Sequence, residues 1–120
     1  STITEFKEVY VFESCVDLLS FLTLAKQGHV PKPATDACFI SLNGANIRYL
    51  DKVLMEHPAI ECVHFCTDND RAGQLAVATF TADTSHKIPT DSWVNYLVEA
   101  NVKDWNELLQ TTEEENELPF

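Results

Sequence analysis

The chain has 120 residues, of which 45% are hydrophobic and 22% charged, a composition typical of one globular domain rather than a disordered or fibrous protein. No apolar run reaches the roughly 20 residues that cross a bilayer, and no basic segment precedes a hydrophobic one near the first residue, so we expect no membrane contact and a cytoplasmic location. The formal net charge is −11, with 19 acidic and 8 basic side chains. This balance disfavours binding DNA by charge alone and suits cation binding.

Three strand-like runs alternate with helix-like stretches, at residues 8–12, 37–42 and 61–67. Each run is nearly continuous in apolar character, as in strands that helices cover on both faces. The alternation therefore predicts a parallel sheet.

A helix follows each of these strands. The first carries apolar residues at helical spacing from Val16 onwards and is closed by Gly28. The second is expected to be capped by Asn46 and to stop before Pro58, and the third to cover residues 71–82.

The remaining segments complete the predicted fold. Residues 83–91 are polar and predict a loop, and residues 93–98 predict a fourth strand. A short closing helix with Leu108 and Leu109 precedes an acidic tail, residues 113–120. We therefore expect an α/β domain over residues 1–112, with a four-stranded, mainly parallel sheet flanked by helices, cut from a larger protein.

The four cysteines predict buried thiols rather than a zinc site or disulfides. Cys62 and Cys66 belong to one strand-like run, where they would stand about 13 Å apart, whereas sulfur ligands lie about 2.3 Å from Zn²⁺. We expect no zinc, and small core cysteines of a cytosolic protein, in which disulfides are rare. The four are Cys15, Cys38, Cys62 and Cys66.

Polar side chains follow all three strands at the point where each strand ends. Glu13 follows the first, Asn43 and Gly44 the second, and Asp68 and Asp70 the third. In open α/β sheets, ligands bind outside the carboxyl ends of the strands. A functional site is therefore expected at this edge.

The acidic residues at this edge predict a Mg²⁺ or Mn²⁺ site. Asp68 and Asp70 would lie about 6.6 Å apart on one side of an extended chain, and a bend there brings them together. Mg²⁺ takes one or two carboxylates and leaves room for phosphates. Glu13 would complete the site or act as general base, and without a metal the neighbouring acids would raise its pKa.

Each of these residues also has a structural interpretation. Asp70 can cap the third helix, and Asn43 with Gly44 can form a turn. Asp17 lies one helical turn after Glu13, where it either joins the site or compensates the helix dipole.

Four further polar residues are also open to two interpretations. Arg71 and Lys103 either contact phosphate or stay at the surface. Asp104 with Glu107 either forms a capping box or contributes to the site.

The ordered segments VYVFESCVD (residues 9–17), SLNG (41–44) and TDNDRAG (67–73) resemble the toprim domain. That family is shared by bacterial primases, type IA and type II topoisomerases, certain nucleases and recombination-repair proteins. Its signature is a glutamate after the first strand and Asp-x-Asp after the third. The segment KDWNE (103–107) resembles the ending of primase-like toprim proteins of bacterial plasmids and other mobile elements, so the resemblance covers nearly the whole chain.

The resemblance implies a toprim-like, three-layer fold and assigns roles to the polar residues. Glu13 would be the general acid or base, and Asp68 and Asp70 the metal ligands. One departure is Ser14, where many members have glycine, and a side chain here would narrow the approach of phosphate to the backbone. The supporting residues would be Asp17, Asn43, Gly44, Arg71, Gly73, Lys103 and Asp104.

The expected function is Mg²⁺-dependent phosphoryl or nucleotidyl transfer on DNA or RNA, primase-like, in replication or mobilisation. Neighbouring domains would supply most of the nucleic-acid contact. The residues leave priming and strand cleavage open, although Tyr10, Tyr49 and Tyr96 all fall in predicted strands or helices, so none is an evident topoisomerase nucleophile.

The residues also allow two alternative functions. The first is a non-catalytic toprim module that binds nucleic acid or assembles DNA-processing complexes. The second is a response-regulator-like receiver, in which Asp68 and Lys103 would only loosely match the phosphoacceptor and the later lysine.

Overall fold

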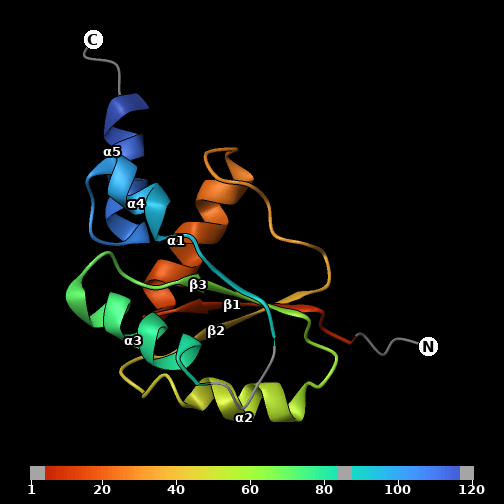
Figure 1. Ribbon diagram of the computed structural model, residues 1–120. Helices are drawn as coiled ribbons and strands as arrows, with labels where there is room; N and C mark the ends of the chain where they lie inside the picture. Colours follow the sequence, from red (N-terminus) through yellow and green to blue (C-terminus); the bar gives the residue numbers. More distant parts are fainter. Residues whose placement is uncertain (1–4, 84–87, 117–120) are drawn as a thin grey trace.

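Four parallel strands form the centre of the computed structural model, which describes residues 5–83 and 88–116 (Figure 1). The strands lie in the order β2, β1, β3, β4, so the first strand of the chain is central. Their bounds are β1 Glu8–Phe12, β2 Ala37–Ser41, β3 Cys62–Cys66 and β4 Thr90–Ser92. The predicted α/β fold with a four-stranded parallel sheet is confirmed.

Helices cover both faces of this sheet and give the domain three layers (Figure 1). Helices α2 and α3 lie on one face, and α1, α4 and α5 lie on the other. Their bounds are α1 Cys15–Lys26, α2 Tyr49–Glu56, α3 Arg71–Thr81, α4 Val94–Ala100 and α5 Trp105–Asn116. Among the described residues, no helix is both long and apolar enough to traverse a bilayer.

Alternation along the strands divides the core into two clusters. Val9 and Val11 of β1 face the layer of α2 and α3, whereas Tyr10 and Phe12 face α1, α4 and α5. In the second cluster, Trp105 is fully buried and its Nε1 donates a hydrogen bond to the carbonyl of Cys66 at 3.0 Å. This contact docks the start of α5 against the end of β3.

The predicted fourth strand is wrong in position. Residues 93–98 belong largely to α4, and the strand is the preceding segment Thr90–Ser92, inside the predicted loop. The rings of Trp93 and Tyr96 contact each other three residues apart, a helical spacing, and both pack on the α1 face. Asn101 ends α4 in the left-handed conformation, with φ 57°. Residues 84–87 of the predicted loop lie outside the described residues.

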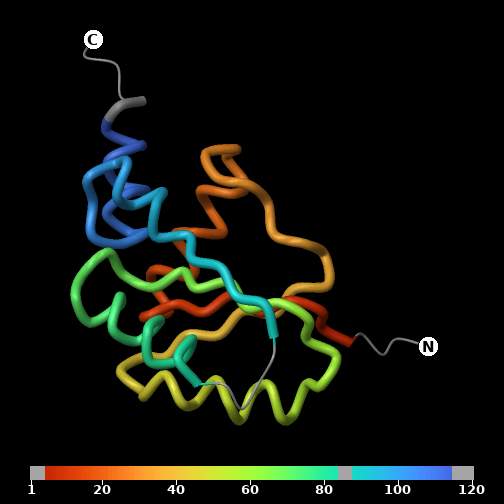
Figure 2. The backbone as a smooth tube through the Cα atoms, viewed as in Figure 1, coloured from red at the N-terminus to blue at the C-terminus, as the bar shows by residue number. Residues whose placement is uncertain are grey.

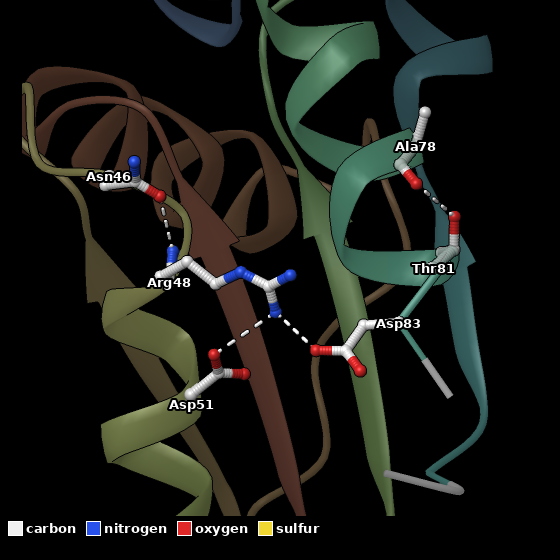
Figure 3. A network of polar contacts seen from close by, with 6 residues as sticks. All are labelled: Asn46, Arg48, Asp51, Ala78, Thr81 and Asp83. Atoms are coloured by element: carbon white, nitrogen blue, oxygen red, sulfur yellow. Dashed lines mark hydrogen bonds and ion pairs between the residues drawn. The ribbon is translucent and has the colours of Figure 1, made fainter. Parts of the chain in front are cut away.

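The second helix begins later than the predicted cap implied. Asn46 Oδ1 accepts a hydrogen bond from the Arg48 backbone N–H at 2.9 Å and closes a turn, and α2 starts at Tyr49 (Figure 3). Arg48 Nη1 then lies 3.3 Å from Asp51 Oδ2 and 2.5 Å from Asp83 Oδ2. Arg48 thus links α2 to the segment that follows α3.

The closing helix is longer than predicted. Helix α5 continues through the acidic residues as far as Asn116, so the regular structure extends beyond residue 112. Residues 117–120 of the predicted tail lie outside the described part of the chain.

Candidate metal centre

Acidic side chains gather at the carboxyl edge of β1 and β3. Oxygens of Asp17 in α1, Asp68 after β3 and Asp104 before α5 all lie within 4.8 Å of one another. We call these three residues the aspartate triad. Carboxylate oxygens at this spacing are suitable ligands for a hard divalent cation.

Asp68 is the member of the triad that most needs a cation. Its Oδ1 is buried and has no hydrogen-bond partner among the described residues. Burial, followed by the charges of Asp17, Glu13, Asp104 and Asp70, raises the pKa of Asp68 to about 7. A buried, unpartnered carboxylate oxygen among other carboxylates is costly unless a proton or a metal ion binds it, so the residues fit Mg²⁺ or Mn²⁺.

Asp17 is held in place by hydrogen bonds from two elements. Its side chain is buried, with the Ser14 hydroxyl donating to Oδ2 at 2.9 Å and the Asn106 backbone N–H donating to Oδ1 at 3.2 Å. Burial raises the pKa of Asp17, and these two hydrogen bonds oppose the rise. Asp17 thus lies in the first turn of α1, where its charge also compensates the helix dipole, and its carboxylate is one of the three in the aspartate triad.

Ser14 has a structural role that glycine could not fill. It is the N-cap of α1, and its hydroxyl accepts a hydrogen bond from the Asp17 backbone N–H at 3.1 Å. The same hydroxyl orients the Asp17 carboxylate. Serine in place of the glycine found in many family members thus supports the triad, because Ser14 caps α1 and orients the Asp17 carboxylate.

Replacing Ser14 with alanine should lower the free energy of unfolding by about 1 kcal/mol, because the cap of α1 is lost. Urea denaturation measures this change. Thr23→Ala is the matched control, since the Thr23 hydroxyl donates within α1 to the Leu19 carbonyl, and alanine there should leave stability unchanged or higher. Equal effects of the two substitutions would contradict the role given to Ser14.

Asp104 forms the cap that the sequence allowed and also lies in the aspartate triad. Its Oδ1 accepts from the Glu107 backbone N–H at 2.8 Å, and Glu107 Oε2 accepts from the Lys103 backbone N–H at 2.9 Å, a reciprocal cap at the start of α5. The same carboxylate belongs to the triad. Asn69 secures this turn, because its backbone N–H donates to the Lys103 carbonyl at 2.7 Å and its Nδ2 to the Val102 carbonyl at 3.1 Å. The loops before α3 and α5 consequently lie side by side (Figure 2).

Asp70 lies at the same edge, but its carboxylate contacts the Gly73 backbone and Lys103. Its Oδ1 accepts from the Gly73 backbone N–H at 2.7 Å and caps α3, and its Oδ2 lies 3.8 Å from Lys103 Nζ. The structure groups Asp68 with Asp17 and Asp104, and gives Asp70 the helix-cap role that the sequence also allowed.

Glu13 is half-buried beside the triad. Its carboxylate accepts a hydrogen bond from the Asp68 backbone N–H, so the two predicted residues do meet at one edge. Burial and the charge of Asp70 raise the pKa of Glu13, and the Asp68 hydrogen bond and the charge of Lys103 oppose the rise. Glu13 also borders an open hollow of 320 Å³ whose walls include Leu42, Ala45, Asn46, Ala72 and Leu75.

Asn43 holds the loop that carries Glu13. Its Oδ1 accepts from the Cys15 backbone N–H at 3.1 Å and from the Ser41 hydroxyl at 2.7 Å, and its own backbone N–H donates to the Glu13 carbonyl at 2.9 Å. Asn43 and Gly44 both have positive φ, 47° and 87°, and form the predicted turn.

Two supporting residues lie at the start of α3. Gly73 is buried, and a Cβ there would stand 2.2 Å from the Asp68 carbonyl oxygen, so α3 packs directly on the backbone of the loop that carries Asp68. Arg71 is exposed, and the described residues include no ion-pair partner for it. Arg71 is therefore not brought into the triad.

Comparison with known proteins agrees with this geometry. No curated protein and no solved structure matches the chain. A family model described as Toprim-like matches residues 10–109, which include the aspartate triad and Glu13. The chain belongs to the Toprim-like family.

Proposed function

We propose that this domain catalyses metal-dependent phosphoryl or nucleotidyl transfer on DNA or RNA, in a primase-like role in replication or mobilisation. Membership of the Toprim-like family implies a metal-binding module of nucleic-acid processing. The observation that carries the catalytic proposal is the buried, unpartnered Oδ1 of Asp68, a residue with a carboxylate oxygen within 4.8 Å of oxygens of Asp17 and Asp104.

The aspartate triad would hold Mg²⁺ or Mn²⁺. A bound cation of this kind neutralises phosphate oxygens and stabilises the attacking and leaving oxygens of a displacement. Three carboxylates exceed the one or two that Mg²⁺ usually takes from a protein, so we expect Asp68 to bind directly and Asp17 and Asp104 to bind either directly or through water.

Glu13 is suited to moving the proton of the reaction. The Asp68 backbone N–H orients its carboxylate beside the triad, and the hollow next to it offers apolar walls for the sugar or base of a bound nucleotide. Lys103, with 60% of its side chain exposed, supplies a cation near Asp70 that can meet a phosphate oxygen.

The charge balance of the domain opposes tight binding of a nucleic acid. The net charge is −11, and the proposed site itself adds several carboxylates. We therefore infer that neighbouring domains of a larger protein supply the basic contacts, and that the chain alone binds DNA or RNA weakly.

The test is an assay of primer synthesis and of strand cleavage by the 120-residue chain while Mg²⁺ or Mn²⁺ is titrated. We expect cation-dependent turnover that Glu13→Gln lowers by about 10²- to 10⁴-fold, the usual contribution of a general acid or base. Glu99→Gln, an exposed position on α4, should leave turnover unchanged.

Turnover that needs no divalent cation, or that survives Glu13→Gln intact, would contradict the proposal. Cation binding without turnover in either assay would support the alternative, a non-catalytic module that binds nucleic acid or assembles a DNA-processing complex.

A further inference from the structure

A second polar cluster lies in the sheet, on the face covered by α1 and towards the amino ends of the strands. Its centre is His64 of β3, which is 8% exposed and stacks on the Tyr10 ring with centroids 4.3 Å apart. His64 and Asp68 are four residues apart, about 13 Å along an extended chain. The cluster is therefore separate from the aspartate triad.

Both ring nitrogens of His64 contact a carboxylate. Nδ1 lies 2.6 Å from Asp91 Oδ1, and Nε2 lies 2.5 Å from Glu8 Oε1. An ionised carboxylate can only accept, so each of these contacts needs a proton between the two atoms, and a metal ion at Nδ1 would replace the proton there. Ligand atoms of Cys62, His64 and Asp91 all lie within 4.8 Å of one another.

Strand register brings these four side chains together. Cys62 and His64 are two residues apart on β3 and point to the same face of the sheet. Asp91 of β4 is paired with His64, and Glu8 of β1 is paired with Cys62. Three adjacent strands thus present a thiol, an imidazole and two carboxylates to one small region.

We propose that Cys62, His64 and Asp91 bind a divalent transition metal such as Zn²⁺ or Co²⁺, with Glu8 orienting the imidazole from Nε2. Thiolate and imidazole ligands favour such ions over Mg²⁺. A carboxylate on the far ring nitrogen is the usual partner of a metal-bound histidine. The distance that separates Cys62 from Cys66 excludes only a site that uses both sulfurs.

The spacing of the ligand atoms requires little rearrangement. In a tetrahedral site with bonds of about 2.0 to 2.3 Å, ligand atoms stand roughly 3.3 to 3.8 Å apart. Nδ1 of His64 and Oδ1 of Asp91 would separate slightly from 2.6 Å, and the Cys62 sulfur would move inwards from at most 4.8 Å. Asp91 has 53% of its side chain exposed, so a fourth position can open towards solvent.

Negative charge around the cluster favours a cation there. Glu8 and Asp91 place two carboxylates against the two ring nitrogens of His64. A divalent ion would offset this concentration of acidic groups. The aspartate triad differs in having only oxygen ligands, so the two sites can be distinguished by sulfur coordination.

The test is optical titration of the 120-residue chain with Co²⁺ in excess Mg²⁺, which occupies sites made of oxygen ligands. We expect a thiolate-to-cobalt charge-transfer band that saturates at one ion per chain and is lost when Zn²⁺ is added. Cys62→Ser should abolish the band. Cys38→Ser, on β2 and packed in the α2 and α3 layer, is the matched thiol control and should leave it unchanged.

Two further variants separate this site from the aspartate triad. Glu8→Gln should weaken Co²⁺ binding by about 10- to 100-fold, as expected for loss of the carboxylate that orients a ligand. Asp68→Asn should leave Co²⁺ binding at the thiol unchanged. Failure of the triad to bind Mg²⁺ would therefore not affect this result.

Absence of the band in the wild type, or its persistence in Cys62→Ser, would overturn the proposal. Circular dichroism checks that each variant is folded. Should Cys62→Ser not fold, Asp91→Asn at the exposed ligand must weaken Co²⁺ binding at least about 10-fold, as expected for removal of a direct ligand, or the proposal fails.

Discussion

Asp68→Asn should make the domain more stable than the wild type at pH 8 without metal, and should remove the stabilisation by Mg²⁺. The pKa of Asp68 is about 7 in the folded state against an ordinary value of 3.8. Between these values the folded chain keeps a proton that the unfolded chain has lost, so wild-type stability falls as the pH rises from about 4 to about 7 and then levels off. Urea denaturation at pH 5 and pH 8 measures this difference.

The change in the free energy of unfolding is expected to be smaller for the proton on Asp68 than for Mg²⁺ binding. Solvent screening of a partly exposed group reduces the Asp68 contribution to about 1 to 2 kcal/mol between pH 5 and pH 8. Mg²⁺ at 100 times its dissociation constant should add about 2.7 kcal/mol to the wild type at pH 8. The variant should gain little from Mg²⁺, because its central ligand is missing.

The informative quantity is the difference in the free energy of unfolding between wild type and variant at each pH. Burial also raises the pKa of Glu13 and of Asp17. The stability of the variant therefore also falls as the pH rises, but less steeply than that of the wild type. Glu99→Gln controls for the loss of one acidic charge at an exposed position. If the free energies of unfolding of Asp68→Asn and the wild type differ by the same amount at pH 5 and pH 8, Asp68 is not the buried, protonated group.

The edge at which the acids gather could be predicted from the sequence, because parallel strands place their carboxyl ends together. Glu13 comes one residue after the end of β1 and Asp68 two residues after the end of β3, so strand direction alone brings them to one edge. The grouping of Asp68 with Asp17 and Asp104 could not be predicted in this way. It depends on the docking of α5 through Trp105, and on a hydrogen bond between Asn106 and Asp17, 89 residues apart.

The polar cluster around His64 was not predicted, and the fourth strand was misplaced, for a related reason. Glu8 and Asp91 contact His64 only because β1, β3 and β4 are neighbours in the sheet. The order of residues along the chain does not show which strands are neighbours. The strand Thr90–Ser92 is short and polar, and it forms by pairing with β3 rather than by its own propensity. The aromatic segment after it has a stronger local strand signal but forms a helix on the α1 face.

Gly73→Ala should unfold or loosen the loop that carries Asp68, although alanine is the better helix former. Alanine in place of glycine inside a helix is worth about 1 kcal/mol in favour of the folded state. Against this, the new Cβ would lie 2.2 Å from the carbonyl oxygen of Asp68, a backbone atom that no side-chain rotation can move away. We expect a net loss of about 2 to 3 kcal/mol in the free energy of unfolding, measured by urea denaturation.

The same substitution should also weaken Mg²⁺ binding, because relief of the clash moves α3 away from Asp68. The cap that Asp70 makes with the Gly73 backbone N–H at 2.7 Å would then lengthen, and the Asp68 carboxylate would leave its position in the aspartate triad. Gly28→Ala is the matched control: φ there is +85°, but no atom lies within 4 Å of the added Cβ. It should cost about 1 kcal/mol through backbone strain alone and leave Mg²⁺ binding intact. Stabilisation by Gly73→Ala would mean that helix α3 does not pack against the Asp68 backbone, and the triad would lose the support on which its geometry depends.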